Sequence, residues 1–165
     1  MKSDVQMMED LVFDVGLKTV TICGKIKFDD KIRRLAASLE NDAGWNVLIP
    51  INIEKDTKKD VNNIDNLRYI HFDKIHKSNA ILVYVDDNYE FLESKNVMGE
   101  ILAALSYEKE IYFSRVMNDE AVTKITQFVN TMEGAFNKKF KVKRFIHRRV
   151  SEFNLYELSY RCKLI

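Results

Sequence analysis

The sequence predicts a single α/β domain built on a doubly wound parallel sheet of four to five strands, with helices on both faces. Short apolar runs rich in β-branched residues alternate with longer amphipathic runs, which is typical of βαβ units. The length of 165 residues fits one domain with a substantial core. A composition of 46% hydrophobic and 31% charged residues excludes a mainly disordered chain.

Four runs have the character of buried parallel strands, because each is short, apolar and bounded by polar or turn residues. They are residues 19–23, 45–49, 80–85 and 111–113. Gly24 follows the first run, and Pro50, the single proline, stops the second.

Apolar residues at helical spacing occupy the intervals between these runs. They predict helices over 4–15, 96–107 and 119–136, and two more that begin near Asp29 and Asp65. The segment 51–64 is polar and is expected to form a loop. Right-handed crossovers between such strands give an open sheet of Rossmann-like or flavodoxin-like plan.

We expect residues 1–165 to form one domain with three parts: an N-terminal helix in 1–17, an α/β core in 18–137 and a basic C-terminal extension in 138–165. Within the extension, residues 138–147 alternate as in a strand. Residues 151–165 fit a strand or a helix equally well.

Cys23 and Cys162 form no CxxC pair, which favours reduced thiols and a cytoplasmic location. The sequence shows no secretory signal and no run near the ~20 apolar residues of a membrane span, so no membrane partner is expected.

The tandem spacing of zinc sites is absent among His71, His76 and His147, and the first two of these residues are expected on helix surfaces. The sequence therefore predicts no metal and no cofactor.

In open α/β sheets, ligands bind at the carboxyl ends of the strands, near the point where strand order reverses. The loops to inspect are 23–30, 50–64, 86–96 and 114–118. The first of them contains neither a GxGxxG fingerprint nor a P-loop. Glu100 lies early in the helix that follows the third strand, where the helix N-terminus favours an ionised carboxylate.

Several short motifs occur in a particular order along the chain. They are Val20 to Phe28; Gly44, Val47 and Pro50; His71, Lys74 and Ile75; Ala80 to Val83; and Tyr89, Ser94, Glu100 and Ile101. Over residues 18–114 this order resembles the nucleoside 2-deoxyribosyltransferase-like family.

The resemblance implies chemistry at the N-glycosidic bond of nucleosides or nucleotides, without a cofactor. Glu100 matches the family glutamate that attacks the anomeric carbon of a 2-deoxyribosyl group. Asp86, Asn88 and Tyr89 would hold the sugar or orient Glu100, and Gly24 would let a ligand approach backbone amides closely. The resemblance also puts Phe28 and Ser94 among the substrate-binding residues.

The chain departs from the family pattern at several positions. Lys25 stands where the family has serine, and Asn79 stands where aspartate is common. Residues 108–110, Glu-Lys-Glu, replace a Gly-Lys turn. These departures indicate either a different substrate or a retained fold without catalysis. A lysine at position 25 suits a phosphate, which favours a nucleotide over a nucleoside.

Three functions therefore stay open. The first is a 2-deoxyribosyltransferase or a deoxynucleoside 5′-monophosphate N-glycosidase. The second is a non-catalytic nucleotide-binding or sensing module. The third is nucleic-acid binding through the basic stretch from Lys138 to Arg149, although a net charge of +1 gives the whole chain no such preference. We also expect a homo-oligomer, since the N-terminal helix and the extension exceed the family core.

Overall fold

The computed structural model of this chain describes residues 18–50, 64–132, 135 and 138–164. The helix predicted over 4–15 lies outside the described residues, and so does nearly all of the polar loop predicted over 51–64.

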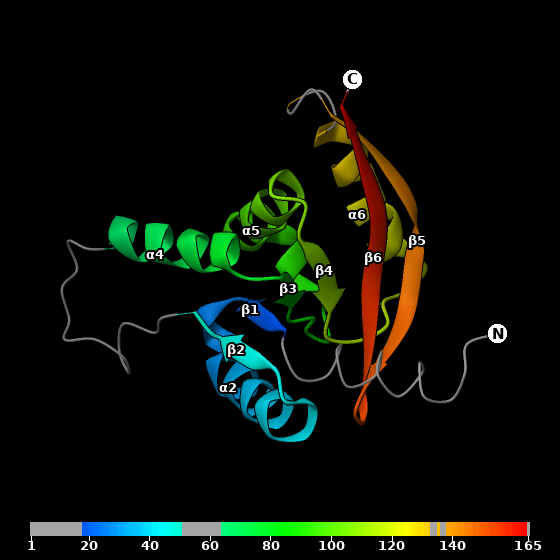
Figure 1. Cartoon of the computed structure of the whole chain (residues 1–165). Helices are drawn as coiled ribbons and strands as arrows, with labels where there is room; N and C mark the ends of the chain where they lie inside the picture. Colours follow the sequence, from blue (N-terminus) through cyan, green and yellow to red (C-terminus); the bar gives the residue numbers. More distant parts are fainter. Residues whose placement is uncertain (1–17, 51–63, 133–134, 136–137, 165) are drawn as a thin grey trace.

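The described residues form an α/β structure with a six-stranded mixed sheet in the order β2-β1-β3-β4-β6-β5 (Figure 1). The strands are β1 (Thr19–Cys23), β2 (Asn46–Leu48), β3 (Ala80–Val83), β4 (Glu110–Phe113), β5 (Lys138–Val150) and β6 (Phe153–Leu164). The first four strands are parallel to one another, with Val20 opposite both Val47 and Ala80. All four strands predicted in the core are confirmed, within one to two residues at their ends.

Four α-helices accompany these strands in the described part of the chain. They are α2 (Asp29–Ser38), α4 (Ile64–Lys77), α5 (Lys95–Ser106) and α6 (Asp119–Met132). A single π-helical turn, Leu39–Ala43, extends α2. It ends at Gly44, whose φ of 70° lies in the left-handed region that glycine adopts without a steric penalty. The predicted helices agree with these four, although α6 ends before residue 136.

The helices cover the sheet from both sides, and each side has its own hydrophobic core. On one side, Ile32 and Ala36 of α2 and Leu39 of the π-helical turn pack against Ile22 and Leu82, among others. On the other side, α4, α5 and α6 pack against the alternate residues of the same strands. Residues of this second cluster include Ile75, Ile81, Val83, Ile101, Ile111 and Ile125. The two central strands β1 and β3 are thus enclosed on both faces.

The expectation of a parallel sheet with four to five strands is confirmed only for the four strands β1 to β4, because the C-terminal segment joins the sheet and makes it a mixed sheet of six strands. Strand β6 pairs antiparallel with β4, with Tyr112 opposite Glu157, and β5 pairs antiparallel with β6. The strand predicted over 138–147 is confirmed, and the ambiguous segment 151–165 forms a strand over 153–164. The physical reason is burial: Leu155 and Leu158 enter the cores on opposite faces of the sheet.

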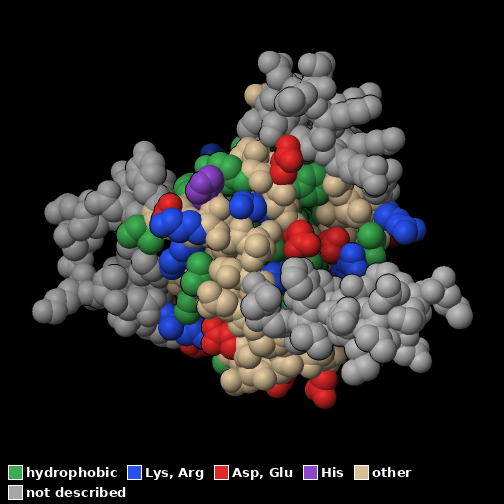
Figure 2. All heavy atoms as spheres, in the orientation of Figure 1, with side chains coloured by type: hydrophobic (Ala, Val, Ile, Leu, Met, Phe, Trp, Pro, Cys, Tyr) green, Lys and Arg blue, Asp and Glu red, His purple; other side chains and the backbone are tan. Residues whose placement is uncertain are grey.

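Acidic and basic side chains are interspersed over the face of the molecule shown in Figure 2, in keeping with the net charge of +1. Among the described helices, none has both the length and the apolar character that crossing a bilayer would require.

If β6 is an integral part of the sheet, shortening its buried leucines must destabilise the whole domain. We expect Leu155→Ala and Leu158→Ala each to lower the free energy of unfolding by about 2–5 kcal/mol, because both side chains are at most 2% exposed. Urea denaturation followed by circular dichroism measures the change. Asn154→Ala, at an exposed position of the same strand, is the control and should shift stability by less than about 0.5 kcal/mol. Leucine variants as stable as this control would contradict the role of β6.

Candidate functional site

The loops that follow β1, β3 and β4 meet at the carboxyl edge of the parallel strands. The order of strands reverses between β1 and β3, because β1 leads to β2 on one side and β3 leads to β4 on the other. Lys27 Nζ, after β1, lies 2.7 Å from Glu90 Oε2, after β3. Arg115 Nη1, after β4, lies 2.8 Å from Asp87 Oδ1, also after β3. The edge predicted to bind a ligand therefore does bring these segments together.

Asp86 organises the turn after β3. Its side chain is buried, and its two carboxylate oxygens accept hydrogen bonds from the backbone amides of Asn88 at 3.2 Å, Glu90 at 3.0 Å and Phe91 at 3.3 Å. The turn passes through Tyr89 with a φ of 54°, a left-handed conformation that is costly for a tyrosine. The three bonds to Asp86 hold the turn in this conformation. Asp86 therefore stabilises the backbone conformation of this turn. Asn88, in the same turn, is exposed.

The hydroxyl groups of Tyr89 and Ser94 also contact backbone amides. Tyr89 Oη accepts a hydrogen bond of 3.0 Å from the amide of Asn118, just before α6. Ser94 Oγ accepts one of 3.2 Å from the amide of Val97 and caps the N-terminus of α5. Asn118 was not predicted from the sequence, although its Oδ1 atom caps α6 by accepting a hydrogen bond of 2.9 Å from the amide of Ala121. An asparagine ahead of an amphipathic run is the signal that identifies it.

Gly24 serves the packing of α2 on the sheet. A Cβ atom at this position would lie 2.7 Å from Ile32 Cδ1 and 3.2 Å from Tyr84 Cβ. The ring of Phe28 packs with its centroid 5.4 Å from that of Tyr84. Lys25 is partly exposed and directly precedes a short 3-10 helix, Ile26–Phe28.

Glu100 lies in the second turn of α5, and its side chain is only 13% exposed. Its carboxylate reaches toward α4, where its Oε1 lies 3.4 Å from Nε2 of His71. The position is past the first turn of α5, so the favourable effect of the helix N-terminus expected for this carboxylate is weak.

Glu100 belongs to a group of three side chains from three elements, of which Cys23 and His71 are buried and Glu100 is largely buried. The ligand atoms of Cys23, His71 and Glu100 all lie within 4.8 Å of one another. Cys23 ends β1, His71 lies on α4 and Glu100 lies on α5. Of the residues predicted for the site, only Glu100 is in this group.

The expectation that His71 lies on a helix surface is wrong, since the residue is 8% exposed. His76, five residues further along α4, is exposed as expected. The physical reason is periodicity: His71 lies one helical turn before Ile75, which is fully buried in the core. That spacing is the signal by which the sequence could have identified it.

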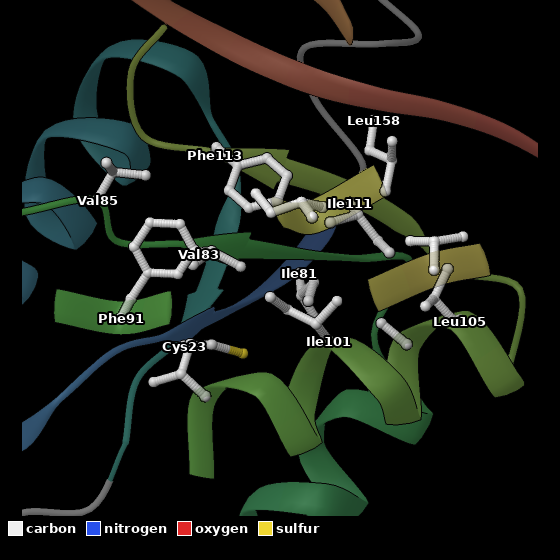
Figure 3. Packing of buried hydrophobic residues seen from close by; sticks show 14 of the residues in the cluster. Cys23, Ile81, Val83, Val85, Phe91, Ile101, Leu105, Ile111, Phe113 and Leu158 are labelled. Carbon is white, nitrogen blue, oxygen red and sulfur yellow. The ribbon is translucent and has the colours of Figure 1, made fainter. Parts of the chain in front are cut away.

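The surroundings of the group are apolar. Figure 3 shows Cys23, with its sulfur atom, beside Ile81 and Ile101 in the cluster of buried hydrophobic residues. Burial raises the pKa of the Cys23 thiol well above its ordinary value, and the nearby Glu100 carboxylate raises this pKa further. The thiol therefore stays protonated and weakly nucleophilic as long as only protein groups surround it.

The group contains buried polar atoms that no hydrogen bond satisfies. Both ring nitrogens of His71 and Oε2 of Glu100 have no hydrogen-bond partner among the described residues. Such atoms are rare in folded proteins and each calls for a physical explanation. A thiol, an imidazole and a carboxylate that converge with spare lone pairs could hold a metal ion or engage a reacting carbon atom.

An open hollow of about 230 Å³ lies elsewhere in the described part of the chain, at the amino end of β4. Residues 108–110 and 157–160 line it. It is smaller than the roughly 300–1,000 Å³ of typical ligand pockets and lies at the end of the sheet opposite to the loops described above. The carboxyl edge remains the better candidate.

Comparison with known proteins adds no family: no family model, no curated protein and no solved structure gives a significant match to this chain.

The packing around Gly24 can be tested against a second glycine. We expect Gly24→Ala to destabilise the protein by about 1–3 kcal/mol, because the added methyl group overpacks the contact with Ile32. Gly99→Ala, in α5, should be neutral or stabilise by up to about 1 kcal/mol, since a Cβ there meets nothing within 4 Å. Chemical denaturation measures both. If Ile32→Val does not reduce the cost of Gly24→Ala, the overpacking explanation fails.

The role of Asp86 can be tested in the same way. Asp86→Ala removes the acceptor for three backbone amides and should lower the free energy of unfolding by about 1–3 kcal/mol. Asp87→Ala is the matched control, because the neighbouring carboxylate is 83% exposed and its ion pair with Arg115 lies on the surface. Equal stability of the two variants in thermal unfolding would contradict this structural role of Asp86 and favour a role in ligand binding.

Proposed function

We propose that this protein acts on the N-glycosidic bond of a nucleoside or nucleotide, with Glu100 as the carboxylate nucleophile. The observation that carries the proposal is the state of this side chain. It is largely buried near the carboxyl end of β1, and its Oε2 atom has no hydrogen-bond partner within the described segments. A nucleophile needs such a free lone pair in partly desolvated surroundings.

The reaction proceeds in two displacements. An oxygen of Glu100 attacks the anomeric carbon of the sugar and forms a C–O bond while the C–N bond to the base breaks. The electron pair of that bond leaves with the base, which takes up a proton from solvent. In the second displacement, water or another base attacks the same carbon, loses a proton to solvent and releases Glu100 as a carboxylate. Water makes the enzyme a hydrolase, and a second base makes it a 2-deoxyribosyltransferase.

Lys25 supports a nucleotide rather than a nucleoside. It follows Gly24 at the end of β1, close to the place where the strand order reverses, and is partly exposed. A lysine ammonium is a suitable partner for a 5′-phosphate. Asn88, exposed in the turn after β3, is a second polar group at this edge. We therefore favour a deoxynucleoside 5′-monophosphate as substrate.

Two wider features belong to the same proposal. We propose that the four parallel strands follow a doubly wound plan to which the hairpin of β5 and β6 has been added. We also propose that the active form is a cytoplasmic homo-oligomer.

A non-catalytic nucleotide-binding module is the second candidate. The observation that favours it is the exposure of Asn88 and the partial exposure of Lys25 at the carboxyl edge, whereas the side chain of Glu100 is only 13% exposed. Nucleic-acid binding through β5 has less support, because Arg148 forms an ion pair with Glu157 at 3.0 Å.

Glu100→Gln tests the proposed chemistry. It keeps the size of the side chain but removes the anionic nucleophile, so release of free base from deoxynucleotides should fall on the order of 10³-fold or more. Chromatography of the reaction mixture measures base release. Glu93→Gln, an exposed position near α5, is the control and should retain activity.

Base release that survives Glu100→Gln would refute Glu100 as nucleophile. If the wild-type protein releases no base but its melting temperature rises with nucleotide, the binding module is correct, since a ligand that binds only the folded state stabilises it.

A further inference from the structure

We propose that Cys23, His71 and Glu100 bind one Zn²⁺ ion. The three ligand atoms lie within 4.8 Å of one another and come from β1, α4 and α5. The proposal concerns an ion that the expected glycosidic chemistry does not use, and it stands independently of that chemistry.

The imidazole of His71 lacks hydrogen bonds within the described part of the chain. The His71 side chain is nine-tenths buried, and neither ring nitrogen has a hydrogen-bond partner in the described residues. A neutral imidazole carries one N–H donor and one lone pair, so without a ligand it leaves both unused in apolar surroundings. Glu100 Oε2 is unused in the same way. A cation placed among these groups would accept lone pairs from all three side chains.

The distances between the three side chains are compatible with tetrahedral zinc. Two ligands bound to zinc at about 2.0–2.1 Å in a tetrahedron lie about 3.3 Å apart. Nε2 of His71 lies 3.4 Å from Oε1 of Glu100. A sulfur ligand at about 2.3 Å from zinc would lie about 3.6 Å from its neighbours. The Cys23 sulfur is within 4.8 Å of the other two atoms, so it has at most about 1.2 Å to move, which a change of side-chain torsion provides.

The chemical types of the three ligands also favour zinc. One thiolate, one imidazole and one carboxylate suit zinc, whereas Mg²⁺ and Ca²⁺ prefer oxygen ligands alone. Binding displaces the thiol proton of Cys23 to solvent and forms a sulfur–zinc bond. The two charges of the ion then balance one thiolate and one carboxylate, so the bound cluster is neutral. A neutral cluster is compatible with the fully buried neighbours Ile75 and Ile101.

Three protein ligands leave the fourth position of a tetrahedral zinc ion open. Water or another small ligand would occupy it. Zinc and the anomeric carbon compete for Glu100, so an occupied site excludes nucleophilic attack by this carboxylate.

Cobalt binding tests the proposal without a substrate and without activity. The full-length wild-type protein, treated with a chelator and dialysed, is titrated with Co²⁺ in reducing buffer. We expect one equivalent to bind, with a thiolate-to-cobalt charge-transfer band and the strong visible bands of four-coordinate cobalt. Zn²⁺ should remove both at equal stoichiometry. A wild-type spectrum that lacks the charge-transfer band overturns the proposal, and this readout requires no variant.

Matched variants then assign the ligands. Cys23→Ser, His71→Ala and Glu100→Gln should each weaken zinc binding by at least about 100-fold, measured by competition with a chromophoric chelator. The controls are His76→Ala on the same helix, Cys162→Ser at the other cysteine and Glu93→Gln, all of which should keep wild-type affinity. Circular dichroism confirms that each variant is folded. Unchanged affinity in a folded ligand variant, or lost affinity in a folded control, overturns the assignment.

The two proposals fail separately. Zinc binding without base release from any nucleotide leaves the metal site intact and removes the glycosidic function. Base release by a protein that binds no cobalt keeps the glycosidic function and removes the metal site. If both hold, added Zn²⁺ should inhibit base release in proportion to its occupancy.

Discussion

Burial of β1 and β3 on both faces is the constraint on which the rest of the structure depends. Every residue of β3 is buried, and four of the five residues of β1 are. Side chains alternate along a strand, so one set must be covered by α2 and the other by α4 and α5. The outer edge of β4 is not left open to solvent, because β6 pairs with it. The hairpin is therefore a part of the sheet and not an appendage.

Because the strands are enclosed on both faces, the polar groups buried beside them need hydrogen-bond partners within the protein. At the end of β3, Asp86 is buried but fully used, because three backbone amides of one turn donate to it. Thr21 on β1 is likewise satisfied, with its Oγ1 atom 2.6 Å from Ser78 Oγ. His71 and Glu100 differ from these groups, because both ring nitrogens of His71 and Oε2 of Glu100 lack a hydrogen bond among the described residues. Trp45 Nε1 and Arg115 Nε lack one there too. The atoms of His71 and Glu100, however, converge with the Cys23 thiol in one group of metal-ligating side chains, which a bound ligand explains better than loose packing does.

The core elements were predictable from the sequence because their signals are local. Apolar runs and helical spacing lie within single segments, and the strands and helices between residues 19 and 132 were anticipated from them. The pairing of β6 with β4 depends on which distant edge is free, which no local pattern encodes. The group at Glu100 was missed for a related reason. Its members come from three segments that are far apart in the sequence. The one local signal was the spacing of four residues between His71 and the buried Ile75, which indicates that His71 faces the core.

The substrate-binding residues stay a prediction, because the resemblance supplies residue types without their local bonds. Tyr89 and Ser94 stand where a hydroxyl was expected to meet a sugar, yet each accepts a hydrogen bond from a nearby backbone amide. Those bonds shape the loop that carries Asn88 and position the helix that carries Glu100. The carboxylate differs from these groups, since one of its oxygens has no partner in the described chain. A carboxylate can share that lone pair with a carbon atom or with a cation, but not with both at once. The occupant of this one oxygen therefore determines whether the carboxyl edge performs covalent chemistry or binds a metal.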